Sequence, residues 1–277
     1  MSLISAANLA ALLDDPSLRI ADVRWSLAAP AAGRFAYAEA HLPRAVFVDL
    51  DTVLTGPSGP GRHPLPEPAA FVAALASLGI GREHRVVACD DAGGTVAARL
   101  WWMLDVLGHP RASVLDGGIG AWTAAGLPLV ADLPAFDEAA AWTDLPRAWP
   151  STISREELAP RLGALTLLDA RAAERYRGEV EPIDPVAGHI PTAVSAPTAT
   201  FLGPDGHFLP ADALAARFEA LGAAAGAVVV SCGSGVNACQ LALAMRAAGL
   251  PDPLLYPGSY SDWSRAGMPI ATGDAPG

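Results

Sequence analysis

Turn residues of this chain recur at one constant spacing. Two glycines, a tryptophan and a proline of the first half each reappear 141 positions later: Gly117, Trp122, Gly126 and Pro128 return as Gly258, Trp263, Gly267 and Pro269. A match of this kind between turn residues and an aromatic residue predicts two copies of one domain within the 277 residues. This duplication limits the possible folds more than any other feature of the sequence.

Predicted strands and helices alternate within each copy. One strand ends on Asp22-Val23-Arg24, and its counterpart ends on Asp169-Ala170-Arg171. Residues 189–194 likewise repeat residues 41–46, each beginning with a His-x-Pro sequence. The alternation predicts an α/β fold in which each copy is a mostly parallel sheet flanked by helices. Because both copies carry the histidine, we expect it to serve the fold, as we do for the Asp-x-Arg pair.

The repeat also suggests where the domains begin and end. We expect the first copy at residues 1–130 and the second at residues 151–277. Residues 131–150 carry two tryptophans, Trp142 and Trp149, and are predicted to form a linker that packs through them.

Composition excludes several classes of partner. The net charge is −11 and no Lys/Arg-rich run occurs, so we expect neither nucleic acid nor a membrane surface as a partner. No apolar run approaches the roughly 18 residues of a membrane span, which favours a cytoplasmic protein. Three cysteines, an odd number, argue against a disulfide framework. Metal-ligand spacings are absent from the sequence, so neither a metal nor an organic cofactor is expected.

One cysteine stands between a predicted strand and a predicted helix. Val228, Val229 and Val230 form a short buried strand, and helix-forming residues follow Asn237. Cys232 lies between them, in a loop whose glycines let several backbone N–H groups point inward. Those groups and the helix N-terminus favour a thiolate. The loop therefore predicts a nucleophilic sulfur at the carboxyl end of the sheet, although a buried structural cysteine has the same local appearance.

The first copy carries no cysteine at the corresponding position. Subtracting the repeat spacing from Cys232 gives Asp91, and a carboxylate cannot perform thiol chemistry. We therefore expect the N-terminal copy to be catalytically inactive and to supply one wall of a cleft between the domains.

The motifs together resemble those of the tandem-domain rhodanese-type sulfurtransferases, and the resemblance covers essentially the whole chain. The loop from Cys232 to Ala238 is similar to the Cys-Gly-Ser-Gly-Val-Thr-Ala loop of 3-mercaptopyruvate sulfurtransferases, with Asn237 in place of threonine. Thiosulfate-preferring members carry arginine and lysine at the positions of Gly233 and Ser234.

The resemblance implies sulfur transfer in two steps. The thiolate of Cys232 would take the sulfane sulfur of a small anionic donor, 3-mercaptopyruvate or thiosulfate, and become a persulfide. A thiol acceptor such as thioredoxin, or cyanide, would then remove the sulfur. No cofactor is implied.

Further positions take their expected roles from the family one by one. Arg175 matches the arginine that binds the anionic end of the donor. Ser234 matches a serine that works with a histidine and an aspartate of the first domain, here His63 and Asp51 by their order in the chain. The remaining loop residues are expected to line the donor site: Gly233, Gly235, Val236 and Asn237.

Two positions are less well defined by the family. A second donor-binding arginine is expected near residues 181–188, but that stretch has none, and Arg177 is the candidate to compensate. Trp25 follows an Asp-x-Arg strand end and is expected to line the cleft, with a place in the domain interface as the alternative.

Other classes of function are open to a cysteine loop on this topology. A phosphatase would need arginine six residues after the cysteine, where Ala238 stands. A non-catalytic persulfide carrier would need Cys232 but no donor clamp such as Arg175, and it would take up one sulfur and stop. A redox-sensing module is a third reading. Cys239, on the helix, is expected to be a core residue.

Overall fold

The computed structural model describes residues 2–140, 142–224 and 226–277. The chain divides into two compact units that exchange short segments. Unit 1 comprises Met1–Gly56, Pro66–Pro150 and Gly203–Phe208, whereas unit 2 comprises Pro57–Leu65, Ser151–Leu202 and Leu209–Gly277. Residues 57–65 therefore belong to the first copy in the sequence but pack within unit 2.

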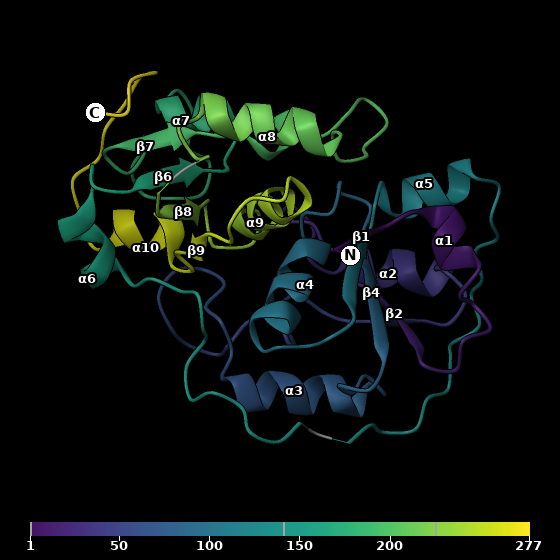
Figure 1. Ribbon diagram of the computed structural model, residues 1–277. Coiled ribbons are helices and arrows are strands. Elements are labelled where there is room, and N and C mark those ends of the chain that lie inside the picture. The colour runs from purple at the N-terminus through teal and green to yellow at the C-terminus, as the bar shows by residue number, and fades with distance from the viewer. Residues whose placement is uncertain (1, 141, 225) are drawn as a thin grey trace. The chain divides into compact units, whose positions relative to one another are not determined.

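Unit 1 is built on a parallel sheet with strand order β1-β5-β4-β2-β3. Strands β1, β2 and β4 of this sheet are labelled in Figure 1. The strands are β1 (Leu3–Ile4), β2 (Leu18–Asp22), β3 (Ala45–Phe47), β4 (Arg85–Cys89) and β5 (Ala112–Leu115). The helices between them are α1 (Ala6–Ala10), α2 (Ala32–Glu39), α3 (Pro68–Ser77), α4 (Ala97–Val106) and α5 (Gly118–Ala124).

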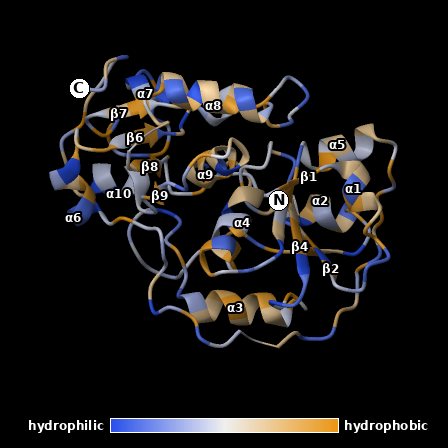
Figure 2. Cartoon of the chain, viewed as in Figure 1, coloured by the Kyte–Doolittle hydropathy of each residue, from blue (hydrophilic) through white to orange (hydrophobic). Residues whose placement is uncertain are grey.

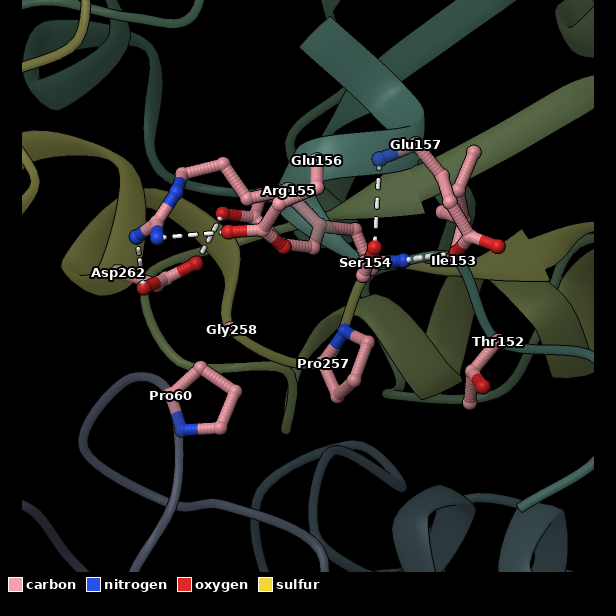
Figure 3. A pocket seen from close by; sticks show the side chains of 11 residues that line it. Pro60, Thr152, Ile153, Ser154, Arg155, Glu156, Glu157, Pro257, Gly258 and Asp262 are labelled. Atoms are coloured by element: carbon pink, nitrogen blue, oxygen red, sulfur yellow. Dashed lines mark hydrogen bonds and ion pairs between the residues drawn. The ribbon is translucent and has the colours of Figure 1, made fainter. Parts of the chain in front are cut away.

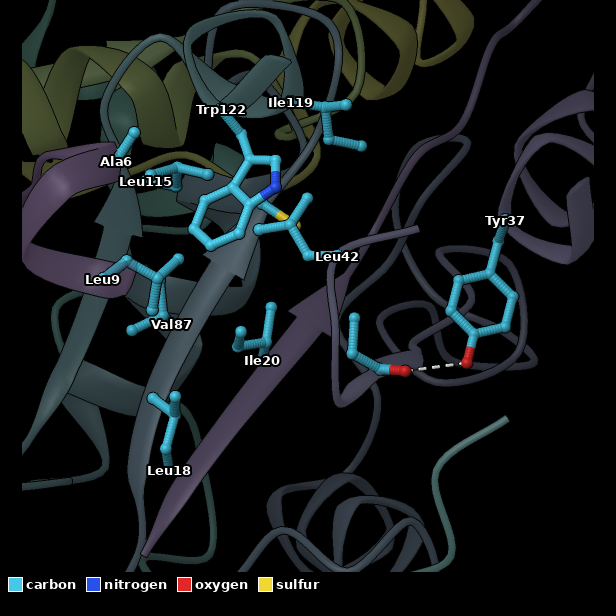
Figure 4. Close-up of a cluster of buried hydrophobic side chains, with 12 residues drawn as sticks. Ala6, Leu9, Leu18, Ile20, Tyr37, Leu42, Val87, Leu115, Ile119 and Trp122 are labelled. Atoms are coloured by element: carbon cyan, nitrogen blue, oxygen red, sulfur yellow. Dashed lines mark hydrogen bonds between the residues drawn. The ribbon is translucent and has the colours of Figure 1, made fainter. Parts of the chain in front are cut away.

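One core cluster of unit 1 lies between the sheet and helices α1, α2 and α5 (Figure 4). Trp122 is fully buried in it, against aliphatic side chains of the strands. Tyr37 joins the same cluster and donates its hydroxyl to the carbonyl of Ala45, 2.8 Å away. Helix α4 packs on β4 and β5, so both faces of the sheet are covered, as parallel strands require.

Unit 2 repeats this architecture with strand order β7-β6-β8-β9, again all parallel. Its strands are β6 (Thr166–Asp169), β7 (Ala193–Ser195), β8 (Val228–Ser231) and β9 (Leu254–Leu255). The α-helices are α6 (Arg155–Leu158), α7 (Ala173–Arg177), α8 (Ala211–Ala220), α9 (Ala238–Ala247) and α10 (Ser259–Arg265), and two short 3₁₀ helices are η1 (Ala159–Arg161) and η2 (Thr198–Phe201).

The core of unit 2 matches that of unit 1. Residues of α6, α7 and α10 form one buried cluster with the strands, and α9 packs on β8 and β9 with α8 beside it. In place of β1, Thr152 makes a single parallel bridge to Leu255 at the outer edge of β9. Two parallel α/β units of one topology confirm the predicted fold class.

The repeated turn motif is held by one hydrogen bond in each unit. The indole N–H of Trp122 donates to the carbonyl of Pro128 at 2.9 Å, and that of Trp263 donates to Pro269 at 2.7 Å. Both rings are buried, so an unpaired indole N–H would be costly there. The proline stands six positions after the tryptophan in both units, and this spacing brings its carbonyl to the indole N–H and closes the turn.

The repeated histidines serve the fold in both units, as expected. His41 and His189 are fully buried, and Nδ1 of each is hydrogen-bonded to the backbone carbonyl of a tyrosine, at 2.7 and 2.8 Å. Each imidazole also stacks on the same tyrosine, Tyr37 or Tyr176.

Hydrophobic residues concentrate in the strands, for example β4 and β6, while hydrophilic residues gather on the short helix α6 (Figure 2). No helix among the described residues has both the length and the apolar character needed to span a bilayer.

Replacing Trp263 with phenylalanine removes the indole hydrogen bond and leaves unfilled volume. We expect a loss of about 2 kcal/mol in the free energy of unfolding, measured by urea denaturation followed by circular dichroism. Trp122→Phe should cost a similar amount because its surroundings are the same. The matched control is Phe35→Leu, at a side chain that is 73% exposed. Equal stability of all three variants would contradict the structural role of the turn.

Candidate active site

Cys232 is the first residue after β8, at the carboxyl end of the parallel sheet of unit 2. Its Sγ accepts the backbone N–H of Gly235 at 3.1 Å and that of Ser234 at 3.4 Å. Its own N–H donates to the hydroxyl of Ser259, which in turn donates to the carbonyl of Tyr256. The side chain is 3% exposed. The loop therefore encloses the sulfur and directs two amide dipoles at it, as in an anion-binding turn.

The tight course of this loop depends on glycine at position 235. Gly235 has φ of +76°, and a Cβ there would lie 2.5 Å from the carbonyl oxygen of Pro257. No other residue type fits both conditions without moving backbone. Val236, expected in the donor site, is buried in the loop. Asn237 is the N-cap residue of α9, and its side chain makes no capping hydrogen bond there.

Sheet register identifies the counterpart of Cys232 in unit 1 as Asp90. Asp22 of β2 pairs with Cys89, and Asp169 of β6 pairs with Ser231, so the residues that follow are Asp90 and Cys232. The expectation of Asp91 was wrong. Seven residues separate β4 from α4, whereas six separate β8 from α9, so the constant spacing does not hold inside this loop.

The carboxylate of Asp90 shows what this type of loop binds. Its two oxygens accept four backbone N–H groups at 2.9 Å, from Ala92, Gly94, Val96 and Ala97. Asp90 is 1% exposed, so the loop of unit 1 is an anion site filled by its own side chain. Unit 2 places a thiol at the same point of the same topology.

Ser234 and His63 are in contact, as predicted. Nδ1 of His63 lies 2.8 Å from Oγ of Ser234, and both side chains are buried. With Nδ1 unprotonated the hydroxyl donates, and with Nδ1 protonated it accepts. The backbone N–H of the same serine donates to Cys232, so the histidine connects to the sulfur through one residue. Residues 57–65 belong to unit 2, which is why this contact lies within one unit.

Asp51 and Trp25 belong to unit 1, where they contact each other. The indole N–H of Trp25 donates to the carboxylate of Asp51 at 3.0 Å, and the aspartate is exposed. This hydrogen bond was not predicted, because Asp51 was expected in the relay with His63 and Trp25 was expected to line the cleft.

Arg175 lies on α7 and is oriented by two carboxylates. Nε and Nη2 donate to Glu181 at 3.2 and 2.6 Å, and Nη2 also reaches Asp184 at 3.4 Å. Its Nη1 lies 3.6 Å from the position of a Cβ on Gly233, beside the cysteine. Burial raises the pKa of Glu181, but the arginine and backbone N–H groups outweigh it, so that pKa is lowered and the pair stays charged.

Arg171 and Asp169 form a buried pair in a structural role, as expected. The guanidinium donates to both carboxylate oxygens of Asp169 and, at 2.7 Å, to the carbonyl of Gly188. It also stacks on the ring of Tyr260 at 3.9 Å. Arg177 instead pairs with Glu179 at the surface, so its donors are engaged away from the cysteine loop.

Two residues near the cysteine were not anticipated from the sequence. Arg62 and Asp184 form an ion pair, and Nη2 of Arg62 lies 2.8 Å from the Cβ position of Gly233. The only signal in the sequence is that Arg62 precedes His63.

A separate pocket of about 200 Å³ lies in unit 2 (Figure 3). Its charged groups pair with one another: Arg155 donates to Asp262 at 2.6 Å and to Glu156 at 2.8 Å. Cys232 is not among the residues that line it. Within the described part of the chain, no group of three acidic, histidine or cysteine side chains is placed to hold a metal ion.

A thiol held by loop amides at the end of a parallel sheet has the geometry expected of a sulfur nucleophile. The rhodanese-like domain model matches residues 5–125 and 154–266, one copy for each unit. The chain therefore belongs to the rhodanese family.

Relatives along the full length are sulfurtransferases. The chain is 45% identical over 284 residues to a probable 3-mercaptopyruvate sulfurtransferase of Pseudomonas aeruginosa, covering 98% of both. It is 34% identical to the thiosulfate sulfurtransferase of Bos taurus, covering 92% of this chain and 87% of that one. The structure of 3-mercaptopyruvate sulfurtransferase from Leishmania major superposes with a TM-score of 0.84 at 31% identity, covering 96% and 74%. The chain is thus an enzyme of the sulfurtransferase class.

Replacing Asp90 with alanine leaves four backbone N–H groups without their acceptor. We expect a loss of about 3 kcal/mol in the free energy of unfolding, measured by urea denaturation. Asp91→Ala is the matched control, because that side chain is exposed, and it should change stability by less than about 0.5 kcal/mol. If the two variants were equally stable, the loop of unit 1 would not depend on this carboxylate.

Proposed function

We propose that this enzyme moves a sulfur atom from a small anionic donor, 3-mercaptopyruvate or thiosulfate, to a thiol or cyanide, and that this atom is carried as the sulfane sulfur of a persulfide on Cys232. The observation that carries the proposal is the Sγ of Cys232 in an amide-lined loop, next to the Ser234–His63 pair. The same amides that favour the thiolate would stabilise the negative charge of the outer sulfur of a persulfide.

Both steps are displacements at sulfur, and they need no external oxidant. The thiolate attacks the donor sulfur, a new S–S bond forms, and the bond from that sulfur to the donor breaks. Thiosulfate releases sulfite with the electron pair, whereas 3-mercaptopyruvate releases an enolate that takes up a proton to become pyruvate. An acceptor thiolate such as that of thioredoxin then attacks the outer sulfur, and the Cys232 thiolate leaves.

The Ser234–His63 pair is suited to the proton that the enolate requires. The hydroxyl of Ser234, a residue of the cysteine loop, contacts His63, and the imidazole can replace a proton that the hydroxyl gives up. Asp51, the expected third member, belongs to unit 1, and its part in the relay stays a prediction. Arg175, beside Gly233, is suited to bind the anionic end of the donor through a planar fork.

The N-terminal copy is proposed to be catalytically inactive, because its anion site is filled by the Asp90 carboxylate. We also propose a cytoplasmic location, where a free catalytic thiol stays reduced.

Cys232→Ser should abolish sulfur transfer with either donor while leaving stability nearly unchanged, because oxygen and sulfur occupy similar space. Turnover is measured as pyruvate or sulfite release against a thiol acceptor. The matched control is Cys239→Ala, a buried helix residue seven positions away, which should keep most of the activity. A wild-type protein that takes up one sulfur and stops would instead be a persulfide carrier.

His63→Ala should affect the two donors differently. We expect kcat/KM to fall by about 100-fold with 3-mercaptopyruvate, whose leaving group needs a proton, and by much less with thiosulfate. Ser234→Ala should show the same selectivity, and the double variant should lose little more because the two groups act as one unit. An equal fall with both donors would contradict a proton-relay role.

A further inference from the structure

The backbone of Cys232 is held by the first residues of α10. The N–H of Tyr260 donates to the carbonyl of Cys232 at 3.0 Å, and that of Ser261 donates to the carbonyl of Gly233 at 2.9 Å. The N–H of the cysteine itself donates to Oγ of Ser259 at 3.1 Å. The peptide groups on both sides of the cysteine are therefore fixed, and one of them is fixed by a side chain.

The hydroxyl of Ser259 is oriented for this contact. It donates its proton to the carbonyl of Tyr256 at 2.8 Å, so it meets the N–H of Cys232 as an acceptor. Ser259 is fully buried, and the cysteine is nearly so. Removing the hydroxyl would leave the N–H as a buried donor without its acceptor, which is costly. The contact therefore constrains the peptide group at the cysteine.

Ser259 makes this contact from a backbone conformation that serine rarely adopts. Its φ is +52°, in the left-handed region that favours glycine. A residue with a side chain is strained there, and such strain persists only where the surrounding contacts enforce it. The contacts that surround Ser259 include the two hydrogen bonds of its hydroxyl, one of which holds the cysteine.

Unit 1 forms the same turn with glycine. Gly118 lies 141 positions before Ser259 and has φ of +56°. The next residues also correspond, because the N–H of Ile119 donates to the carbonyl of Asp90 at 2.9 Å, as in the turn of unit 2. A Cβ on Gly118 would lie 2.2 Å from that carbonyl oxygen, so this turn leaves no room for a side chain. Glycine adopts the required φ without strain, but it has no hydroxyl to hold the backbone of Asp90.

Another repeated turn shows how strain that serves only the fold is distributed. Arg44 and Thr192 each follow the repeated histidine motif, and their φ angles are +65° and +69°. A residue with a side chain occupies the left-handed position in both copies there, so the strain belongs to the common fold. The strain at Ser259 occurs only in the copy that carries Cys232, which points to a role toward the cysteine.

We propose that Ser259 is a positioning residue for Cys232: its hydroxyl fixes the cysteine N–H and thereby aims Sγ at the loop amides. The direction of the N–H sets φ of the cysteine, and φ sets where its Cα–Cβ bond points. The amides concerned are those of Ser234 and Gly235, at 3.4 and 3.1 Å from the sulfur. The inference rests on the proposed function, because it takes Cys232 as the nucleophile, and it adds the residue that orients this nucleophile.

Two variants separate the hydroxyl from the backbone strain. Ser259→Ala removes the hydroxyl and keeps the Cβ, whereas Ser259→Gly removes the hydroxyl and also relieves the strain. Stability is measured as the midpoint of urea denaturation. We expect the midpoint of Ser259→Gly to lie above that of Ser259→Ala, because glycine adopts this φ without strain.

The rate of reaction distinguishes a positioning role from a contribution to stability alone. Persulfide formation is followed in single turnovers at saturating 3-mercaptopyruvate and at saturating thiosulfate, as added mass on the Cys232 peptide. We expect both variants to react about tenfold more slowly than the wild type with either donor, and equally slowly despite their different stabilities. The half-saturating donor concentration should change little.

Hydrogen exchange of the Cys232 amide tests the contact without any donor. Exchange is measured by NMR spectroscopy relative to the amides of β8, which corrects for global stability, and we expect it to be about tenfold faster in both variants. Ser264→Ala is the matched control, because this hydroxyl is also buried on α10 but donates within the helix, to the carbonyl of Tyr260 at 2.8 Å. Its rate of persulfide formation and its Cys232 exchange should equal those of the wild type.

Three results would overturn the proposal. Recovery of the wild-type rate in Ser259→Gly would show that the serine affects stability alone, equal urea midpoints of the two variants would exclude strain at this position, and unchanged exchange of the Cys232 amide would exclude the contact. A wild-type protein that forms no persulfide with either donor would instead contradict the proposed function, and the exchange comparison would still decide whether Ser259 holds the cysteine.

Discussion

The convergence of backbone N–H groups on one acceptor side chain is the interaction that shapes the corresponding loop in both halves of this protein. In unit 1 the acceptor is the carboxylate of Asp90, which accepts four of these groups and closes its loop permanently. In unit 2 the loop places Cys232 at the same register position. One copy satisfies the loop amides with a fixed carboxylate, and the other directs two amides at a thiol, the group on which the proposed persulfide would form.

Residues 57–65, which are far from the cysteine loop in the sequence, place two polar side chains beside it. They supply His63, in contact with Ser234, and Arg62, beside Gly233. The ion pair of Arg62 with Asp184 and the backbone bond to Ser261 hold this segment on unit 2. Glycine at position 233 leaves room for this guanidinium, because a Cβ there would lie 2.8 Å from Nη2 of Arg62.

Features that depend on a local residue pattern could be predicted from the sequence, whereas contacts between residues far apart in the chain could not. The Trp–Pro turn follows from repeated residues whose spacing is fixed by one hydrogen bond in each unit. The parallel sheets and the position of Cys232 follow from the alternation of apolar strand segments with helix-forming segments. Asp91 was predicted as the counterpart of Cys232 because a constant spacing was applied to the whole copy. The loop of unit 1 has one residue more than that of unit 2, and this shifts the counterpart to Asp90. Arg62 could not be found, since its neighbours Asp184 and Gly233 are more than 100 positions away and no periodicity links them.

The most direct test of the central claim is to determine where the transferred sulfur resides between the two steps. The protein is incubated with donor in the absence of acceptor, and its peptides are then examined by mass spectrometry under conditions that preserve persulfides. The account predicts the added mass of one sulfur atom on the peptide that contains Cys232, and its loss when a thiol acceptor is added. Sulfur on the peptides of Cys89 or Cys239, or product formed with no sulfur on the protein, would contradict it.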